Sequence, residues 1–139
     1  MSKMIYINLP VTNLAASTRF YKAIGCEKNE QFSDHQASSM VWSDTVTFQL
    51  MANDYFATFT PKKIADARVT SEVLLALTRD SREEVDAIVE AAAVAGGKAD
   101  IREPQDMGWL YTRAFEDPDG HVFEAISADM GAALAEAGG

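Results

Sequence analysis

The sequence predicts an α+β protein made of two tandem βαβββ modules, for two reasons. The element order βαβββ occurs twice along the 139 residues, and the two halves align at their last strands. Residues 44–51 align with residues 119–126, which places Gln49 over Glu124. Repetition at a fixed period indicates a duplicated supersecondary unit. We therefore expect a single domain of ordinary length, built from two half-modules.

The first module is predicted over about residues 4–52. Residues 4–11 alternate and are rich in β-branched and aromatic side chains, so they predict a strand with Tyr6 and Asn8 on one face. Asn13 is a good N-cap for a helix that ends before Gly25. Three shorter strands are expected next, at about residues 27–32, 37–42 and 46–51.

A looser connector at about residues 53–70 leads to the second module, predicted over about residues 71–127. Ser81 and Glu84 have the spacing of a capping box, which predicts the start of a helix that ends at Gly96. The inward face of this helix is expected to carry Val85, Ile88, Val89 and Ala92. Strands are expected at about residues 73–78, 98–103, 109–115 and 121–127, and residues 128–139 are expected to form a C-terminal tail.

The composition excludes several classes of partner. The net charge is −9 and the longest basic run is Lys62-Lys63, so nucleic acid and anionic membrane surfaces are not expected partners. No apolar stretch approaches the roughly 20 residues of a membrane-spanning helix, and the first residues lack the pattern of a secretion signal. We therefore expect a cytoplasmic protein.

Cysteine and histidine are scarce, which limits metal chemistry. Cys26 is the single cysteine, so no intrachain disulfide or cysteine-based zinc cluster can form. Of the two histidines, His35 is expected in a polar turn. His121 is expected on the strand face opposite Glu124, because adjacent strand residues point to opposite sides. Neither histidine is predicted to ligate a metal.

Three segments carry distinctive motifs: residues 9–14 (LPVTNL) with residues 20–25 (FYKAIG), residues 91–97, and residues 115–124 (FEDPDGHVFE). Together they resemble the vicinal oxygen chelate superfamily of glyoxalases, bleomycin resistance proteins and dioxygenases. Within it, the sequence is most similar to small glyoxalase-like bacterial proteins. The resemblance implies two modules with curled sheets that form a cup for a small molecule. It also implies a homodimer, with each cup built either within one chain or by modules of two chains.

The resemblance also implies where a metal would bind. Metal-dependent members carry one ligand on the first strand and one on the last strand of each module, typically His and Glu. The matching positions in this chain are Tyr6, Gln49, Leu74 and Glu124. Only Glu124 keeps the ligand type, since a phenol and an amide are weak donors and leucine is none. We therefore expect no cofactor and no tightly bound divalent metal.

The residues expected to face the cup and bind a ligand are Tyr6, Asn8, Gln49, Leu74, Trp109, Tyr111 and Arg113. Glu124 is expected on an apolar cup floor, where it is a candidate catalytic acid or base and equally a structural hydrogen-bond acceptor. Arg102 and Arg113 are candidates for binding an anionic group of a substrate, because a guanidinium binds oxyanions through two parallel hydrogen bonds.

Two function classes fit these residues. The first is a metal-independent, glyoxalase-like enzyme that uses Glu124 for proton transfer on a small oxygenated substrate. The second is a non-catalytic protein of the bleomycin-resistance type that sequesters a ligand. A metal-dependent lactoylglutathione lyase or dioxygenase is a third alternative, which the substitutions at the ligand positions disfavour.

Overall fold

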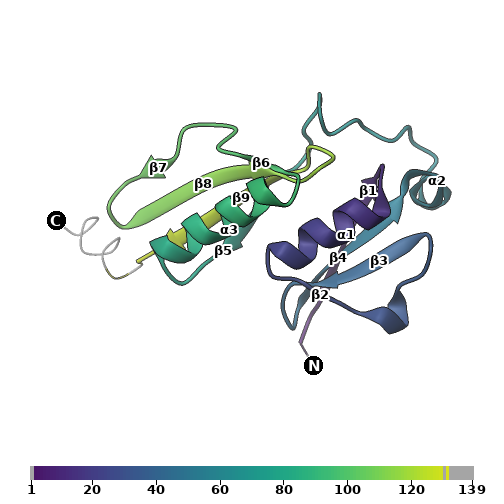
Figure 1. Cartoon of the computed structure of the whole chain (residues 1–139), viewed down its shortest axis with the longest axis horizontal. Helices are drawn as coiled ribbons and strands as arrows, with labels where there is room; N and C mark the ends of the chain where they lie inside the picture. The colour runs from purple at the N-terminus through teal and green to yellow at the C-terminus, as the bar shows by residue number, and fades with distance from the viewer. Residues whose placement is uncertain (1, 130, 132–139) are drawn as a thin grey trace. The chain divides into compact units, whose positions relative to one another are not determined.

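The protein comprises two compact units, which divide after Thr70 (Figure 1). The computed structural model describes residues 2–129 and 131. The first unit contains β1 (Ile5–Val11), α1 (Leu14–Ala23), β2 (Glu27–Lys28), η1 (Glu30–Phe32), β3 (Ala37–Val41), β4 (Val46–Ala52), α2 (Asn53–Phe56) and η2 (Ala57–Phe59). The second contains β5 (Leu75–Thr78), α3 (Arg82–Val94), β6 (Lys98–Ala99), β7 (Gln105–Asp106), β8 (Leu110–Glu116) and β9 (Val122–Ala128).

The two units share one strand order, as the duplication predicts. The first sheet runs β1-β4-β3-β2, and the second runs β5-β9-β8-β6, with β7 as a further partner of β8. In both sheets the first strand is parallel to the last, and the other pairs are antiparallel. The prediction of an α+β fold with two βαβββ modules is therefore confirmed.

The core of the first unit lies between α1 and its sheet. The Asn13 side chain caps α1 by accepting a hydrogen bond from the N–H of Ala16 at 3.0 Å. Buried Tyr21 then contacts Phe48 of β4, with ring centroids 5.6 Å apart. Gly25 ends the helix with φ +116°, a left-handed conformation that favours glycine.

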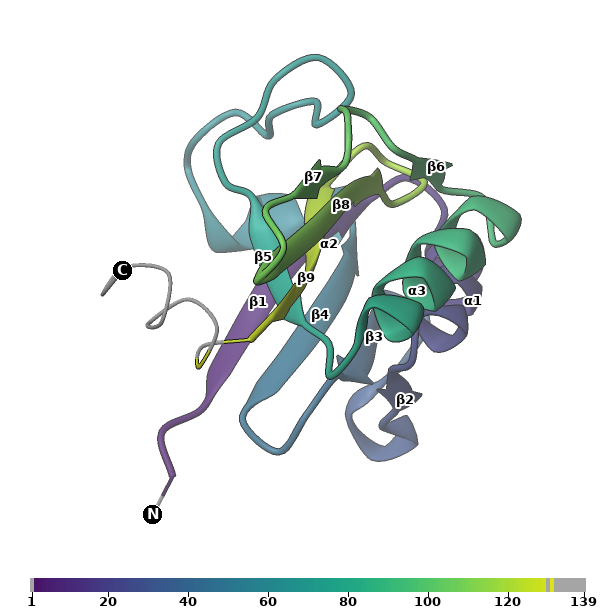
Figure 2. The ribbon, with the colours of Figure 1, turned by 90° about the vertical axis from the view of Figure 1, so that its left-hand side faces the viewer.

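In the second unit, α3 lies along one face of the sheet (Figure 2). The Ser81 hydroxyl caps the helix by accepting from the N–H of Glu84, as predicted. The Glu84 carboxylate pairs with Arg79 at 2.7 Å, a contact that the capping-box pattern does not predict. All four residues predicted on the inward face are buried: Val85, Ile88, Val89 and Ala92. Opposite them, Phe115 and Phe123 stack with centroids 5.3 Å apart.

Two predicted strands are shorter than expected. At residues 27–32 only Glu27–Lys28 is a strand, because the Asn29 side chain caps the short η1 helix that follows. At residues 98–103 only Lys98–Ala99 is a strand, because Asp100 takes φ 52° and turns the chain.

At the C-terminal end, β9 extends to Ala128, so the predicted tail begins later than residue 128. Most of that tail, residues 130 and 132–139, lies outside the described residues. Within the part of the chain that is described, no helix has the length and apolar character to cross a membrane.

Candidate functional site

The predicted site residues of the first module lie on the sheet face opposite α1. Phe48 of β4 points toward α1, so its neighbour Gln49 points away. Asn8 is the register partner of Gln49 on the adjacent β1, and Tyr6 lies two residues earlier on the same face. Tyr6 is 59% exposed. The structure therefore brings Tyr6, Asn8 and Gln49 together on one surface.

The second module has an equivalent surface, which we call the helix-free face. Its members are Ala76, Thr112, Ala114, Glu124 and Ile126, which alternate with residues that point toward α3. Glu124 lies centrally, with Ala76 of β5 and Ala114 of β8 as its register partners. Leu74 lies just before β5 and is 57% exposed.

Glu124 is ion-paired. Nη2 of Arg102 donates to Oε1 of Glu124 at 2.8 Å, and 20% of the glutamate side chain is exposed. The cup floor around Glu124, expected to be apolar, therefore also carries a guanidinium. The pair places a positive charge directly beside the carboxylate.

Arg102 reaches Glu124 by crossing β8. It lies in the loop between β6 and β7, which both pair with β8, whereas Glu124 is on β9 at the far side of β8. The arginine stem therefore passes over β8 on the helix-free face, where Thr112 and Ala114 are buried. The Thr112 hydroxyl is buried and has no hydrogen-bond partner among the described residues.

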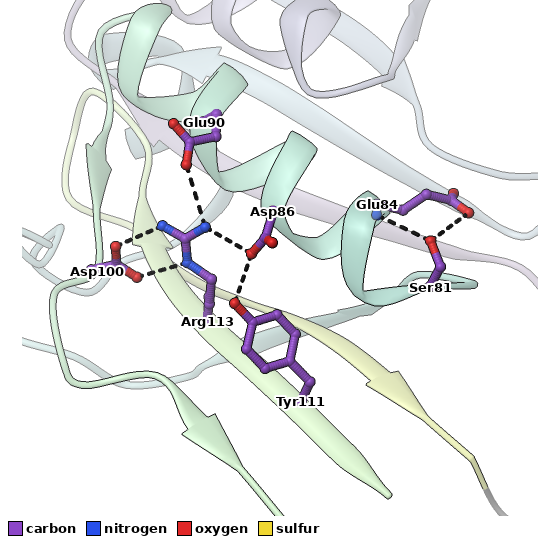
Figure 3. Close-up of polar contacts among 7 residues, drawn as sticks. All are labelled: Ser81, Glu84, Asp86, Glu90, Asp100, Tyr111 and Arg113. Carbon is purple, nitrogen blue, oxygen red and sulfur yellow. Dashed lines mark hydrogen bonds and ion pairs between the residues drawn. The ribbon is translucent and has the colours of Figure 1, made fainter. Parts of the chain in front are cut away.

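Tyr111 and Arg113 lie on the opposite side of β8, against α3 (Figure 3). The Tyr111 hydroxyl donates to Asp86 Oδ1 at 2.7 Å, and Arg113 Nη1 donates to the same oxygen at 2.9 Å. Arg113 also forms two hydrogen bonds to Asp100, at 2.7 and 3.0 Å. The prediction that these two residues share a face with Glu124 is therefore wrong, because odd-numbered residues of β8 point toward the acidic side of α3.

The contacts of this cluster shift the pKa values of its members. The hydrogen bond with Asp100 raises the pKa of Arg113, and the same bond lowers the pKa of Asp100. The hydrogen bond from Tyr111 lowers the pKa of Asp86, and this contact raises the pKa of Tyr111. Each group is held in its usual charge state. The cluster thus joins α3, β8 and the loop after β6, which is a structural role.

Trp109, the last of the predicted binding residues, immediately precedes β8 and is half-buried. Its backbone carbonyl accepts a hydrogen bond from the N–H of Asp129 at 2.7 Å, which fixes the end of β9 beside it.

The residues present do not fit a divalent metal. Among residues 2–129 and 131, no group of three or more His, Cys, Asp or Glu side chains is arranged to hold an ion. A cation at Glu124 would be repelled by the guanidinium of Arg102. His35 is exposed in a turn, and the backbone N–H of His121 donates to Asp117 in the turn before β9.

Comparison with known proteins gives one family. The model of the Glyoxalase/Bleomycin resistance protein/Dioxygenase superfamily matches residues 3–125. No curated protein matches.

Similar solved structures include hypothetical protein SA1046 from S. aureus, with 28% identity, a TM-score of 0.77, and coverage of 92% of this chain and 95% of that chain. A glyoxalase/bleomycin resistance protein/dioxygenase family enzyme from Burkholderia phytofirmans PsJN is 20% identical, with a TM-score of 0.74 and coverage of 92% and 100%. Fosfomycin resistance protein FosX from Mesorhizobium Loti is 15% identical, with a TM-score of 0.68 and coverage of 96% and 98%.

Proposed function

Because the chain belongs to the Glyoxalase/Bleomycin resistance protein/Dioxygenase superfamily, we propose that it is a glyoxalase-like protein that binds a small molecule without a tightly bound metal. The observation that carries the proposal is the ion pair between Arg102 and Glu124. Glu124 is the one carboxylate at the four positions that the family resemblance implies for a metal. The positive charge beside this carboxylate comes from the guanidinium of Arg102 and not from a metal ion.

The other three positions support the same proposal. Tyr6 and Gln49 offer a neutral phenol and a neutral amide, and Leu74 offers no donor atom. Such side chains hydrogen-bond to or pack against an organic ligand, whereas divalent metal ions in such sites prefer imidazole or carboxylate ligands. The helix-free face and the corresponding face of the first module are therefore suited to a polar organic molecule.

Metal analysis tests this proposal directly. The protein is purified without chelator or affinity metal, and its content of Ni, Zn, Fe, Mn and Co is measured by mass spectrometry. We expect each metal far below one equivalent per chain, and no change in thermal stability after treatment with a chelator. One equivalent of any of these metals, with loss of stability on its removal, would refute the proposal.

A non-catalytic, ligand-sequestering role is the form of this function that the contacts support best. Tyr111 and Arg113, which were expected to act beside Glu124, are hydrogen-bonded on the other face of β8. One oxygen of the Glu124 carboxylate already accepts a hydrogen bond from Arg102, so the protein itself occupies part of its acceptor capacity. Proton transfer by Glu124 on a small oxygenated substrate is the second candidate function, and retention of the carboxylate at this position favours it.

A ligand screen with a matched variant separates the two candidates. Metabolites and antibiotics are screened by thermal shift, since a ligand that binds only the folded state raises its melting temperature. Fosfomycin is included because two of the similar structures are named fosfomycin resistance proteins. For a catalytic role, Glu124→Gln abolishes conversion of the ligand and retains its binding. For sequestration, the ligand is recovered unchanged from both proteins.

A further inference from the structure

We propose that the Arg102 guanidinium anchors a carboxylate group of the ligand on the helix-free face, and that the ligand is a small organic acid with an apolar body. This inference rests on the proposed small-molecule function and names the chemical class that the second module recognises.

Arg102 differs from neighbouring arginines in its unused hydrogen-bonding capacity. Arg113 is only 12% exposed and contacts three carboxylates, those of Asp86, Asp100 and Glu90. Arg82 places two of its nitrogens on the carboxylate of Asp106. Arg102 donates one hydrogen bond, from Nη2 to Glu124, and its other N–H groups have no protein partner among the described residues. Its side chain is 37% exposed, so these donors are accessible to a ligand.

A hydrogen bond to Glu124 restrains the guanidinium before any ligand binds. The stem of Arg102 lies over β8 and the Glu124 carboxylate holds its end at 2.8 Å. A pre-positioned donor group loses little side-chain entropy on binding, which raises affinity. The planar fork of a guanidinium also matches the two oxygens of a carboxylate.

The surroundings of the pair indicate what the rest of the ligand resembles. Ala76 and Ala114 flank Glu124 in the register, and Ile126 is the next residue of β9 on this face. Of these side chains, Ala76 is exposed and Ile126 is half-buried, so these two offer apolar surface beside the charged pair, whereas Ala114 is buried. The charges of Arg102 and Glu124 cancel, and the chain carries a net charge of −9. Attraction thus comes from directed hydrogen bonds and apolar contact, rather than from a long-range field.

Benzoate and benzamide form the test pair, because they share one shape and differ in the charge of the polar group. Binding to the full-length protein is measured by calorimetry, and the site is mapped by amide chemical-shift changes. We expect benzoate to bind at least about tenfold more tightly than benzamide, since a charge-assisted hydrogen bond is stronger than a neutral one. Shift changes are expected in β8, β9 and residues 100–104. Inorganic phosphate, which lacks an apolar body, is expected to bind more weakly than benzoate.

Three variants assign the effect to Arg102. Arg102→Gln should reduce benzoate affinity to that of benzamide, and Arg102→Lys should restore only part of it, because an ammonium lacks the planar fork. Arg68→Gln removes the same charge from the connector, within the first unit, and should leave benzoate affinity unchanged. Thermal melting of each variant shows that it is folded.

Each failure has a distinct meaning. Equal binding of benzoate and benzamide by the wild type and by Arg102→Gln would refute the carboxylate proposal while leaving small-molecule binding intact. Phosphate binding as tight as that of benzoate would refute the organic-acid class. Absence of benzoate binding up to its solubility limit would refute the inference, and the broader ligand screen would still test the proposed function.

Discussion

At the scale of single residues, the buried hydroxyl of Thr112 yields a prediction about stability. Its Oγ1 atom has no hydrogen-bond partner among the described residues, and a buried hydroxyl without a partner loses its hydration on folding. Thr112→Val keeps the shape and removes this penalty. We expect it to raise the free energy of unfolding by about 1 kcal/mol, measured by urea denaturation.

Thr18→Val is the matched control, because the Thr18 hydroxyl donates to the Leu14 carbonyl and pairs with the Ser38 hydroxyl, both at 2.7 Å. This variant should be destabilised by about 1 kcal/mol. A destabilised Thr112→Val would mean that the Thr112 hydroxyl is hydrogen-bonded, which would contradict the structure.

Single residues also show how far a sequence can predict a site. Alternation along a strand predicts Tyr6 and Asn8 on one face, and the family resemblance implies that Gln49 joins them; the register pair of Asn8 and Gln49 agrees. The contact of Arg102 with Glu124 spans 22 residues and depends on the course of a loop, which no periodicity encodes. For β8 the predicted alternation of side chains is correct, but the two faces are exchanged. Tyr111 faces α3, where Asp86 accepts a hydrogen bond from its hydroxyl.

At the scale of elements, Arg113 links α3, β8 and the loop after β6 through its ion pairs. Arg113→Gln would leave Asp86 and Asp100 close together without their shared cation. We expect a loss of about 2 kcal/mol in the free energy of unfolding, measured by urea denaturation.

Arg82→Gln should have a smaller effect, because both side chains of the Arg82–Asp106 pair are close to half exposed. An equal loss in the two variants would indicate that burial of Arg113 does not determine its contribution.

The same cluster predicts how stability depends on pH. The pKa values of Asp86 and Asp100 are lower in the folded protein than the ordinary aspartate value of about 3.9. A lowered folded-state pKa contributes stability above the unfolded-state value, and this contribution is lost as the pH falls through the folded-state value. The melting temperature should therefore decrease from about pH 5 downward.

Arg113→Gln removes the cation that lowers the pKa of Asp100 and helps to lower the pKa of Asp86. The melting temperature of this variant should therefore decrease less steeply below pH 5 than that of the wild type. Parallel curves for the wild type and the variant would show that other carboxylates cause the acid sensitivity. The hydrogen bond from Arg82 lowers the pKa of Asp106 to about 2. This aspartate contributes equally to the acid sensitivity of the wild type and of the variant, because Arg113→Gln leaves the Arg82–Asp106 pair in place.

Elements whose ends depend on neighbouring residues could be predicted, and those whose ends depend on a contact distant in sequence could not. Asn13 and Ser81 cap their helices as expected, because capping needs only a few neighbouring residues. The strand expected at 98–103 ends at Ala99, since Asp100 takes a left-handed conformation and binds Arg113. That partner lies on another strand, so sequence proximity does not show it.

At the scale of the whole molecule, duplication preserved the strand order and changed the chemistry. Gln49 of the first module and Glu124 of the second lie at equivalent positions, facing Asn8 and Ala76 respectively. The connection between β2 and β3 contains η1 and no arginine, whereas Arg102 follows β6. The first module thus offers neutral polar groups and the second a charged pair, so we expect charge recognition to depend on the second module alone.

The exposed apolar residues at two sheet edges support the proposal of a homodimer. β1 and β5 are edge strands of their sheets. Ile5 and Tyr6 of β1 are 54% and 59% exposed, and Val73 and Leu74 before β5 are each 57% exposed. Apolar side chains along an open strand edge favour association with another chain. We expect a dimer by size-exclusion chromatography with light scattering at micromolar concentration.

Ile5→Lys tests whether the β1 edge forms this interface. A lysine on an edge strand opposes pairing with another strand, so the variant should shift the population toward monomer without loss of secondary structure. Val94→Lys is the control, because Val94 is 90% exposed at the end of α3 and belongs to a helix, not to a strand edge, so the dimer should persist. A monomeric wild type would contradict the dimer, and a dimeric Ile5→Lys variant would place the interface elsewhere.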